Sequence, residues 1–158
     1  MIIKAIVLDI DGTLLNTGKI ISEKTKQALI AAQEKGIKVI LASGRPTTGM
    51  LELAEQLEMT KYEGFLVSYN GARVTDCLTK EVLFNQAMSI ETGQAILEHL
   101  KNFDVIPMID KEDYLYVNDV YSGMLDLPDG AFNIIEYEAR GGNFKLSEID
   151  DLAAFATF

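Results

Sequence analysis

The sequence is poor in several residue types that mark particular classes of protein. It contains one cysteine, one histidine and no tryptophan in 158 residues. The single cysteine, Cys77, excludes an internal disulfide and a cysteine metal cluster. The chain lacks a stretch of about 18 consecutive apolar residues, the length that a transmembrane helix needs, and it starts with an apolar run rather than a charged leader segment. We therefore expect a cytoplasmic protein without a membrane partner.

Positive charge is also scarce. The chain carries 14 lysines and arginines against 24 aspartates and glutamates, a net charge of −10, and it contains no basic run. This balance argues against nucleic acid and anionic membrane surfaces as partners. The length fits one ordinary domain, or one domain with part of a second. The composition is typical of a globular enzyme.

The most informative stretch follows the apolar run from Ile2 to Leu8, which predicts a buried parallel strand. Asp9 and Asp11 come directly after this run. Side chains two positions apart on an extended chain point to the same side, so both carboxylates can face one reacting atom. Gly12 then gives the chain the conformational freedom to turn sharply.

This arrangement suits phosphoryl transfer through an aspartyl-phosphate. One carboxylate attacks phosphorus, while the second protonates the leaving alcohol and then activates water. Because two carboxylates repel an anionic substrate, a divalent cation is needed, and Mg²⁺ prefers such hard oxygen ligands. A solvated turn is the alternative for an isolated Asp-x-Asp. A calcium loop of the EF-hand type is excluded, because the glycine comes fourth instead of sixth and Ile20 stands where the loop needs a glutamate.

The string Leu8–Leu15, Leu-Asp-Ile-Asp-Gly-Thr-Leu-Leu, resembles motif I of the haloacid dehalogenase superfamily. The neighbouring sequence narrows the resemblance to the Cof-like phosphatases. The resemblance implies an α/β fold, with a Rossmann-like core and a large α/β cap after the third core strand. It also implies that Asp9 is the nucleophile and Asp11 the general acid/base, that both hold Mg²⁺, and that Gly12 and Thr13 bind phosphate or substrate.

A β-α-β unit is predicted around this motif. Ser22 is typical of a helix N-cap, and Gly36 is typical of the position just after a helix. The strand 37–42 follows at once and should run parallel to the first strand. In an open α/β sheet, ligands bind beyond the carboxyl ends of the strands, so the end of this strand and motif I should converge on one anion site.

That strand end reads Ser43-Gly44-Arg45. These residues offer three groups that bind phosphate. They are the Ser43 hydroxyl, the Gly44 backbone, which a ligand can approach closely, and the Arg45 guanidinium. An ordinary turn before a helix is the alternative for this segment alone. Next to motif I it resembles motif II of the family, which implies that Ser43 holds the transferring phosphoryl group, assisted by Gly44, and that Arg45 contacts phosphate or substrate.

The third strand, 65–69, follows a predicted helix at 48–58 and ends in Asn70 and Gly71. In Cof-like phosphatases a similar string marks the edge of the active site near the passage into the cap. The resemblance therefore implies that Asn70 and Gly71 face substrate. A turn asparagine that tolerates positive φ explains the same residues equally well.

The remaining residues predict shorter elements. The predicted elements are a hairpin at 72–75 and 82–86, a helix capped by Ser89, a hairpin at 105–109 and 114–117, and a strand with the start of a helix within 144–158. From Tyr121 onward the pattern is weak, and Gly141-Gly142 marks a loop. We assign residues 1–84 to the N-terminal part of the core and residues 85–158 to part of the cap.

Two motifs of the family have no match in this chain. Lys145 has the wrong context for the lysine that contacts the phosphoryl group, and Asp150 and Asp151 follow no buried strand with glycine. The chain thus resembles the N-terminal part of a phosphatase whose remainder lies C-terminal to it. An incomplete core of this kind would need a partner chain or self-association to cover its open sheet edge.

We therefore predict an Mg²⁺-dependent phosphomonoester hydrolase that acts on a small phosphorylated metabolite, such as a sugar phosphate. The two missing motifs leave open whether this short chain is active. One alternative is a non-catalytic protein of the same fold that binds phosphate or a partner chain. The other is a phosphotransferase similar to the phosphomutases, which share motif I.

Overall fold

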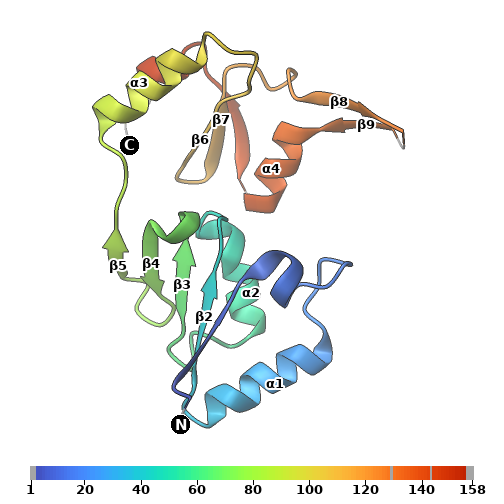
Figure 1. Cartoon of the computed structure of the whole chain (residues 1–158), viewed down its shortest axis with the longest axis vertical. Helices are drawn as coiled ribbons and strands as arrows, with labels where there is room; N and C mark the ends of the chain where they lie inside the picture. Colours follow the sequence, from blue (N-terminus) through green and yellow to red (C-terminus); the bar gives the residue numbers. More distant parts are fainter. Residues whose placement is uncertain (1–2, 129, 143, 156–158) are drawn as a thin grey trace. The chain divides into compact units, whose positions relative to one another are not determined.

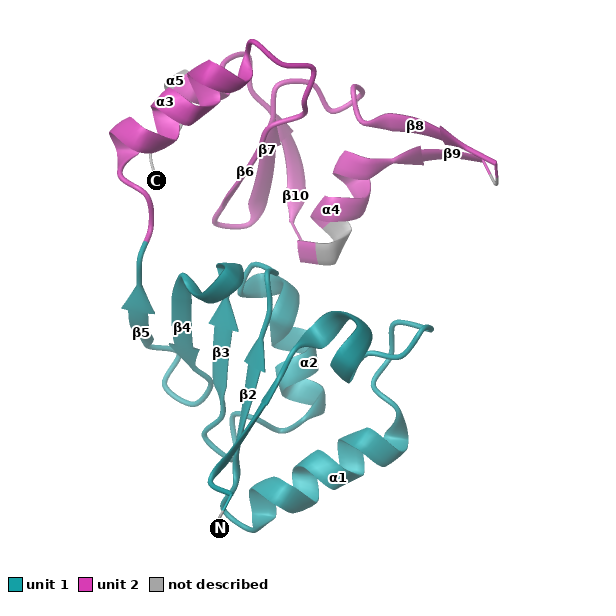
Figure 2. Cartoon of the chain, in the orientation of Figure 1, with its two compact units in different colours: residues 1–86 teal, residues 87–158 magenta. Residues whose placement is uncertain are grey.

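The computed structural model describes residues 3–128, 130–142 and 144–155 (Figure 1). The chain forms two compact units, residues 1–86 and residues 87–158 (Figure 2). The assignment of residues 1–84 to a core and 85–158 to a cap stays a prediction. Ile2, in the predicted first strand, and residues 156–158, in the predicted last helix, lie outside the described residues.

Unit 1 is built on one five-stranded sheet in which the strands follow their order along the chain. The strands are β1 (Ala5–Leu8), β2 (Lys38–Ala42), β3 (Phe65–Ser68), β4 (Arg73–Asp76) and β5 (Val82–Asn85). The first three are parallel, and β4 and β5 form an antiparallel hairpin that continues the sheet from β3. The predicted α/β class, β-α-β unit and first hairpin are confirmed.

The helices of unit 1 begin and end for identifiable reasons. Helix α1 (Glu23–Glu34) starts after Ser22, whose Oγ accepts a hydrogen bond from the Thr25 N–H at 3.1 Å. It is followed by Gly36 with φ +80°, as predicted. The helix predicted at 48–58 is shorter: a single 3₁₀ turn, η2 (Thr48–Met50), leads into α2 (Leu51–Gln56). Glu58 has φ +54°, a left-handed conformation that cannot continue a right-handed helix.

One face of the parallel strands carries the core of unit 1. Paired residues on this face, such as Leu8, Leu41 and Leu66, lie side by side in register. They pack with apolar side chains of α1 and α2, including Leu29 and Leu53, in one cluster of buried residues. Period-two burial along the strands therefore fixes which face the helices cover.

The first strand is not buried as predicted. β1 lies at the edge of the sheet and pairs only with β2 among the described residues, and the side chain of Val7 is 61% exposed. The apolar run predicts burial on both faces because parallel strands are usually covered on both. Here Ile40 and Phe65, which continue the Val7 row across the sheet, are only half-buried. Self-association through this edge stays a prediction.

Unit 2 combines a three-stranded sheet, a hairpin and three helices. The sheet has the order β10 (Lys145–Glu148), β7 (Tyr114–Val117), β6 (Met108–Lys111), and β8 (Met124–Leu127) pairs with β9 (Gly130–Asn133). The helices are α3 (Ile90–Leu100), α4 (Ile134–Gly142) and α5 (Leu152–Phe155). The predicted Ser89 cap is confirmed, since its Oγ accepts the Thr92 N–H at 3.2 Å.

Three predictions for unit 2 differ from the structure. β6 begins at Met108 instead of residue 105, and Pro107, which has no N–H to donate to a ladder, stands directly before it. The weak pattern after Tyr121 contains the β8–β9 hairpin and α4. The predicted loop at Gly141-Gly142 is the last turn of α4, because buried Ile135 and Ala139 one helical turn apart anchor that helix in spite of the glycines.

Among the described residues, no helix combines the length and the apolar character that crossing a membrane requires.

Candidate active site

The segment after β1 folds into a tight turn that displays the two aspartates. In this turn, η1 (Ile10–Leu14), the Leu14 N–H donates to the Asp9 carbonyl at 3.1 Å. Gly12 has φ +78°, which a side chain would strain. Ile10 and Leu14 are buried, whereas Asp9 and Asp11 are exposed. The buried pair anchors the turn, so the polar residues between them are held at the surface.

Arg45 binds the Asp11 carboxylate through both of its oxygens. The guanidinium Nε donates to Asp11 Oδ2 and Nη2 donates to Oδ1, each at 2.8 Å. Arg45 Nη1 also donates to the Gly49 carbonyl at 3.3 Å, which fixes the guanidinium plane. Such fork-to-fork contacts are stronger and more directional than single charged hydrogen bonds. Motif I on β1 and motif II on β2 are thus joined, 34 positions apart in the sequence.

A second cation, Lys19, reaches the same carboxylate from the loop after η1. Its Nζ lies 3.3 Å from Asp11 Oδ1, and its side chain is 62% exposed. The hydrogen bond from Arg45 is the main reason that the pKa of the Asp11 carboxyl lies below its ordinary value, and Lys19 lowers this pKa further against the opposing effect of partial burial. Asp11 is therefore held as a carboxylate at neutral pH.

The ends of β2 and β3 are tied together beside this ion pair. The Ser43 N–H donates to the Val67 carbonyl at 2.9 Å, and the Asn70 N–H donates to the Ser43 carbonyl at 3.2 Å. Ser43 Oγ accepts the Arg45 N–H at 3.2 Å. Motif II and the Asn70-Gly71 segment therefore form one connected rim at the carboxyl ends of neighbouring parallel strands.

The Asn70 side chain lies against the backbone of Gly44. A Cβ on Gly44 would lie 2.9 Å from Asn70 Oδ1, so any side chain there would displace the asparagine. Tyr69 and Asn70 both have left-handed backbones, with φ of +53° and +54°, followed by Gly71 at +95°. Left-handed backbone conformations at consecutive residues with side chains cost conformational free energy. Such strain is found mainly at functional sites.

The predicted site residues are not all linked to one another. Gly12, Thr13 and Gly71 lie exposed on the same turns as their predicted partners. Within residues 3–128, 130–142 and 144–155, no lysine or arginine forms an ion pair with the Asp9 carboxylate, whereas Asp11 has two cationic partners. The two aspartates of motif I therefore stand in different electrostatic surroundings. Their spacing in the sequence does not reveal this difference.

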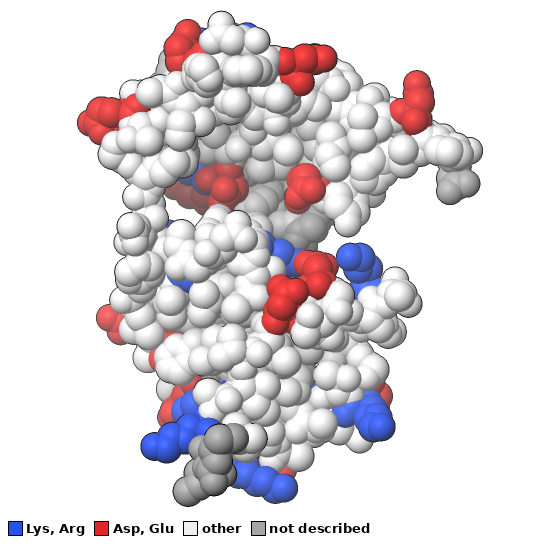
Figure 3. All heavy atoms as spheres, viewed as in Figure 1, with Lys and Arg blue, Asp and Glu red and all other residues white. Residues whose placement is uncertain are grey.

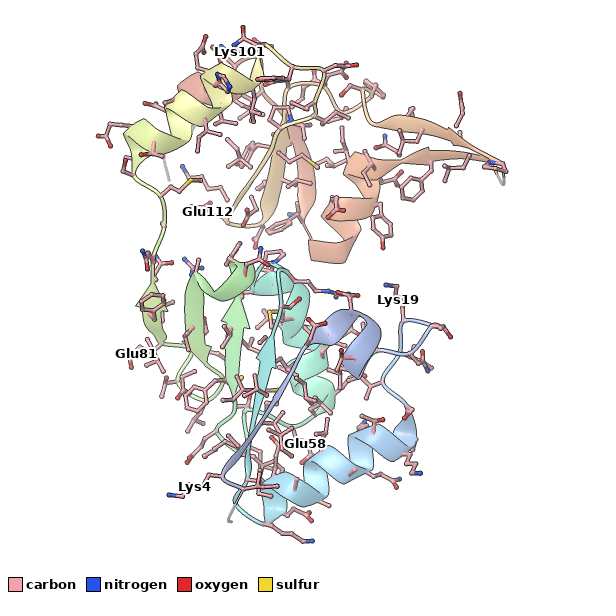
Figure 4. All side chains as sticks on the ribbon, viewed as in Figure 1. Lys4, Lys19, Glu58, Glu81, Lys101 and Glu112 are labelled. Carbon is pink, nitrogen blue, oxygen red and sulfur yellow. The ribbon has the colours of Figure 1, made fainter. Side chains whose placement is uncertain are left out.

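Lys19 is the site residue that the sequence did not single out. It lies on the loop between η1 and α1 (Figure 4), and the loop composition gives no signal beyond one basic residue next to Gly18. Acidic and basic side chains gather on the part of unit 1 that carries η1 (Figure 3). A lysine eight residues after an aspartate in a polar loop becomes interpretable only when the loop is folded.

η1 and the residue before it offer oxygen ligands of the kind that Mg²⁺ binds, the Asp9 carboxylate and the Asp11 carbonyl. Within the described part of the chain, no group of three or more His, Cys, Asp or Glu side chains is placed to hold a metal ion. Mg²⁺ commonly binds through one or two carboxylates, with water and substrate phosphate completing its shell. The donor chemistry fits Mg²⁺, although the number of protein ligands is small.

Cys77 does not belong to the site. It is buried in the core cluster of unit 1, and burial raises the pKa of its thiol to about 11. A thiol that stays protonated at neutral pH is a poor nucleophile. Cys77 is therefore a packing residue of the core.

Comparisons with known proteins place these features in a family. Residues 6–153 match the model of a family described as haloacid dehalogenase-like hydrolase. A Streptococcus pyogenes serotype M6 protein named "Putative phosphatase M6_Spy0533" is 36% identical over 104 residues, 66% of this chain and 34% of that protein. The Bacillus subtilis 5-amino-6-(5-phospho-D-ribitylamino)uracil phosphatase YcsE is 39% identical over 74 residues, 47% of this chain and 28% of that protein.

A solved structure agrees with the sequence matches. The crystal structure of a haloacid dehalogenase-like hydrolase from Bacteroides thetaiotaomicron superposes with a TM-score of 0.83 and 30% identity, covering 98% of this chain and 55% of that one. The chain thus spans about a third of the curated relatives and about half of this solved structure. The predicted fold and family are confirmed: the chain belongs to the haloacid dehalogenase-like hydrolases.

Proposed function

We propose that unit 1 carries the motif I and motif II half of a phosphomonoester hydrolase site, and that unit 2 is part of a cap that selects the substrate. The observation that carries this proposal is the fork between Arg45 and Asp11 at 2.8 Å, beside the exposed Asp9. It supports different roles for the two aspartates. Asp9 stays available as a nucleophile, and Asp11 is held in place for proton transfer.

The proposed reaction has two steps. In the first, an Asp9 carboxylate oxygen attacks phosphorus, the bond from phosphorus to the ester oxygen breaks, and the leaving alcohol takes its proton from Asp11. Asp11 must be protonated for this step, against the lowered pKa that its hydrogen bond with Arg45 imposes. In the second, Asp11 takes a proton from water, the water oxygen attacks phosphorus, and the Asp9 carboxylate leaves. The ionised state of Asp11 suits this second step, in which Asp11 acts as a base.

The rim formed by β2 and β3 supplies the proposed phosphate-binding groups. Ser43 and Gly44 offer a hydroxyl and an open backbone at the strand end. Gly12 and Thr13 lie on η1, and Asn70 and Gly71 on the neighbouring turn, where they can contact the rest of the substrate. Because Arg45 orients Asp11, we assign Arg45 mainly a positioning role. Contact with the substrate is its additional role.

Mg²⁺ is the proposed cofactor. When bound, it would offset the repulsion between the carboxylates and an anionic phosphate ester. The Asp9 carboxylate and the Asp11 carbonyl would hold it together with water and substrate oxygens. With so few protein ligands we expect weak binding, in the absence of further carboxylates.

The proposed substrate class is a small phosphomonoester of a sugar or sugar alcohol. The name of the YcsE relative specifies a phosphorylated ribityl compound, and relatives of this chain are named as phosphatases. The non-catalytic alternative finds no support in these names. The phosphotransferase alternative shares the first step with hydrolysis. It differs only in the second step, in which a sugar hydroxyl takes the phosphoryl group in place of water.

The direct test is phosphate release from p-nitrophenyl phosphate with and without Mg²⁺. We expect hydrolysis that needs the metal, that falls to background in Asp9→Asn, and that falls about 10²–10⁴-fold in Asp11→Asn. Asp104→Asn, a change of an exposed aspartate in unit 2, is the matched control and should keep full activity. Activity that persists in Asp9→Asn would contradict the proposal.

A further inference from the structure

The loop that carries Lys19 is held in one shape by Asn16. The Asn16 N–H donates to the Ile20 carbonyl at 3.0 Å, and the Lys19 N–H donates to the Asn16 carbonyl at 2.9 Å. The Asn16 Oδ1 also accepts the Gly18 N–H at 2.9 Å and the Ile20 N–H at 3.3 Å. Lys19 itself has φ +58°, a conformation that its neighbours must enforce. The loop therefore presents this lysine at a defined place although the loop is exposed.

The two cations on Asp11 are held with unequal strength. Arg45 makes two contacts of 2.8 Å with Asp11 and a third with the Gly49 carbonyl, and its side chain is 26% exposed. Lys19 makes one contact of 3.3 Å, and its side chain is 62% exposed. An exposed single ion pair of this kind contributes little and exchanges readily. Arg45 alone can keep Asp11 in position, so Lys19 is available for another anion.

We propose that Lys19 is a substrate-binding residue whose ammonium group moves from Asp11 to the phosphate of the incoming ester. This inference rests on the proposed function. A phosphate group carries more charge than a single carboxylate oxygen and offers more acceptor oxygens, so it competes well for a flexible ammonium. The move would also remove one of the two contacts at Asp11 Oδ1 at the moment when the substrate arrives.

The first test uses the full chain with Mg²⁺, and inorganic phosphate as the probe in calorimetric titration. We expect Lys19→Met to raise the Kd for phosphate roughly tenfold or more, the loss expected for one charge-assisted hydrogen bond. Lys19→Arg, which keeps the charge, should recover most of the affinity. Lys24→Met removes an exposed lysine from α1 and is the matched control, with an expected change of less than about twofold.

The second test separates binding from positioning in the hydrolysis of p-nitrophenyl phosphate. A binding role predicts that KM rises in Lys19→Met by a larger factor than kcat falls. A fall in kcat with an unchanged Kd for phosphate would show that Lys19 only orients Asp11, and would overturn the inference.

The outcomes also distinguish this inference from the proposed function. Phosphate affinity that is the same in Lys19→Met and Lys24→Met, together with hydrolysis that still depends on Asp9, would overturn the inference alone. A wild-type chain that neither binds phosphate nor hydrolyses the ester would overturn both.

Discussion

Among the described residues, a single cluster of 14 buried apolar residues joins the parallel strands of unit 1 to α1 and α2, whereas unit 2 has two such clusters of four. The candidate site lies entirely on unit 1, at the turns that follow β1, β2 and β3. A large continuous core resists local deformation, and a catalytic constellation needs supports of that kind.

The two units also differ in what they expose. On unit 1 the groups that form ion pairs at η1 are charged side chains held by hydrogen bonds, and the apolar Val7 and Ile20 are exposed beside them. On unit 2 the β8–β9 hairpin exposes Met124, Leu125 and Leu127. Exposed apolar side chains that lie together on a surface are typical of an interaction site, whereas the ion pairs of η1 are not.

The largest predicted difference between the units concerns core deletions. Leu41→Ala removes a side chain with no exposure from the cluster of unit 1 and should destabilise that unit by about 3–5 kcal/mol. Leu115→Ala removes a side chain from a four-residue cluster of unit 2 and should cost about 2 kcal/mol. Amide hydrogen exchange in β2 and β7 reports the two losses separately. The half-exposed Leu51→Ala is the control, and equal losses in the two units would contradict the comparison.

Thiol reactivity measures how well each core excludes water. With a pKa raised to about 11 from an ordinary 9.0, Cys77 should react with iodoacetamide at pH 8 roughly 100-fold more slowly than an exposed thiol. Since the folded chain holds this proton more tightly than the unfolded chain, stability should fall as the pH rises from about 9 to 11. A Leu115→Cys probe in a Cys77→Ser background should react faster. Faster labelling of Cys77 than of this probe would show that the core of unit 2 excludes water better than the core of unit 1.

Helix caps allow a matched comparison, because each unit has one serine cap of the same geometry. Ser22 and Ser89 accept the Thr25 and Thr92 N–H groups at 3.1 and 3.2 Å. Each Ser→Ala change should destabilise its own unit by about 1 kcal/mol, and each Ser→Asp change should restore most of that loss. Urea denaturation followed by hydrogen exchange measures both. A loss that spreads from Ser89→Ala into unit 1 would show that the units do not respond independently.

The smallest predicted effect comes from the ion pair in the site. Arg45→Met should lower stability at pH 7 by no more than about 1 kcal/mol, since Asp11 is largely exposed. The folded-state pKa of Asp11 is depressed, so this stabilisation is present above the ordinary value of 3.8 and is lost as the pH falls through the folded-state pKa. Urea midpoints of the two proteins should converge below pH 3.8. If the urea midpoints of the two proteins differ by the same amount at all pH values, the loss of stability comes from packing and not from the ion pair.

Much of unit 1 follows from local sequence signals. Ser22, Gly36 and the apolar strands predict α1, β2 and β3 correctly, because caps and period-two patterns are local. The exposure of β1 could not be predicted in the same way. An apolar run describes the residues of a strand, whereas burial depends on which other segments lie beside it.

The site illustrates the same limit at the level of side chains. The motifs predicted that Asp11 and Arg45 lie near each other, but not that the arginine forks onto the aspartate. Lys19 was missed because the Asn16 turn is a local signal that predicts a loop, but it does not tell which side chain the lysine contacts eight residues away. In unit 2, Gly141 and Gly142 lie at the end of α4. The buried side chains of Ile135 and Ala139 in the same helix stabilise it.

The most direct test of the central claim is to trap the phosphorylated chain. The wild-type chain would be incubated with p-nitrophenyl phosphate and Mg²⁺, reduced with borohydride, and mapped by peptide mass spectrometry. An aspartyl-phosphate is reduced to an alcohol, so the account predicts this change at Asp9, with Asp11 unmodified and no change in Asp9→Asn. Phosphate release without modification of Asp9, or modification at another residue, would contradict the account.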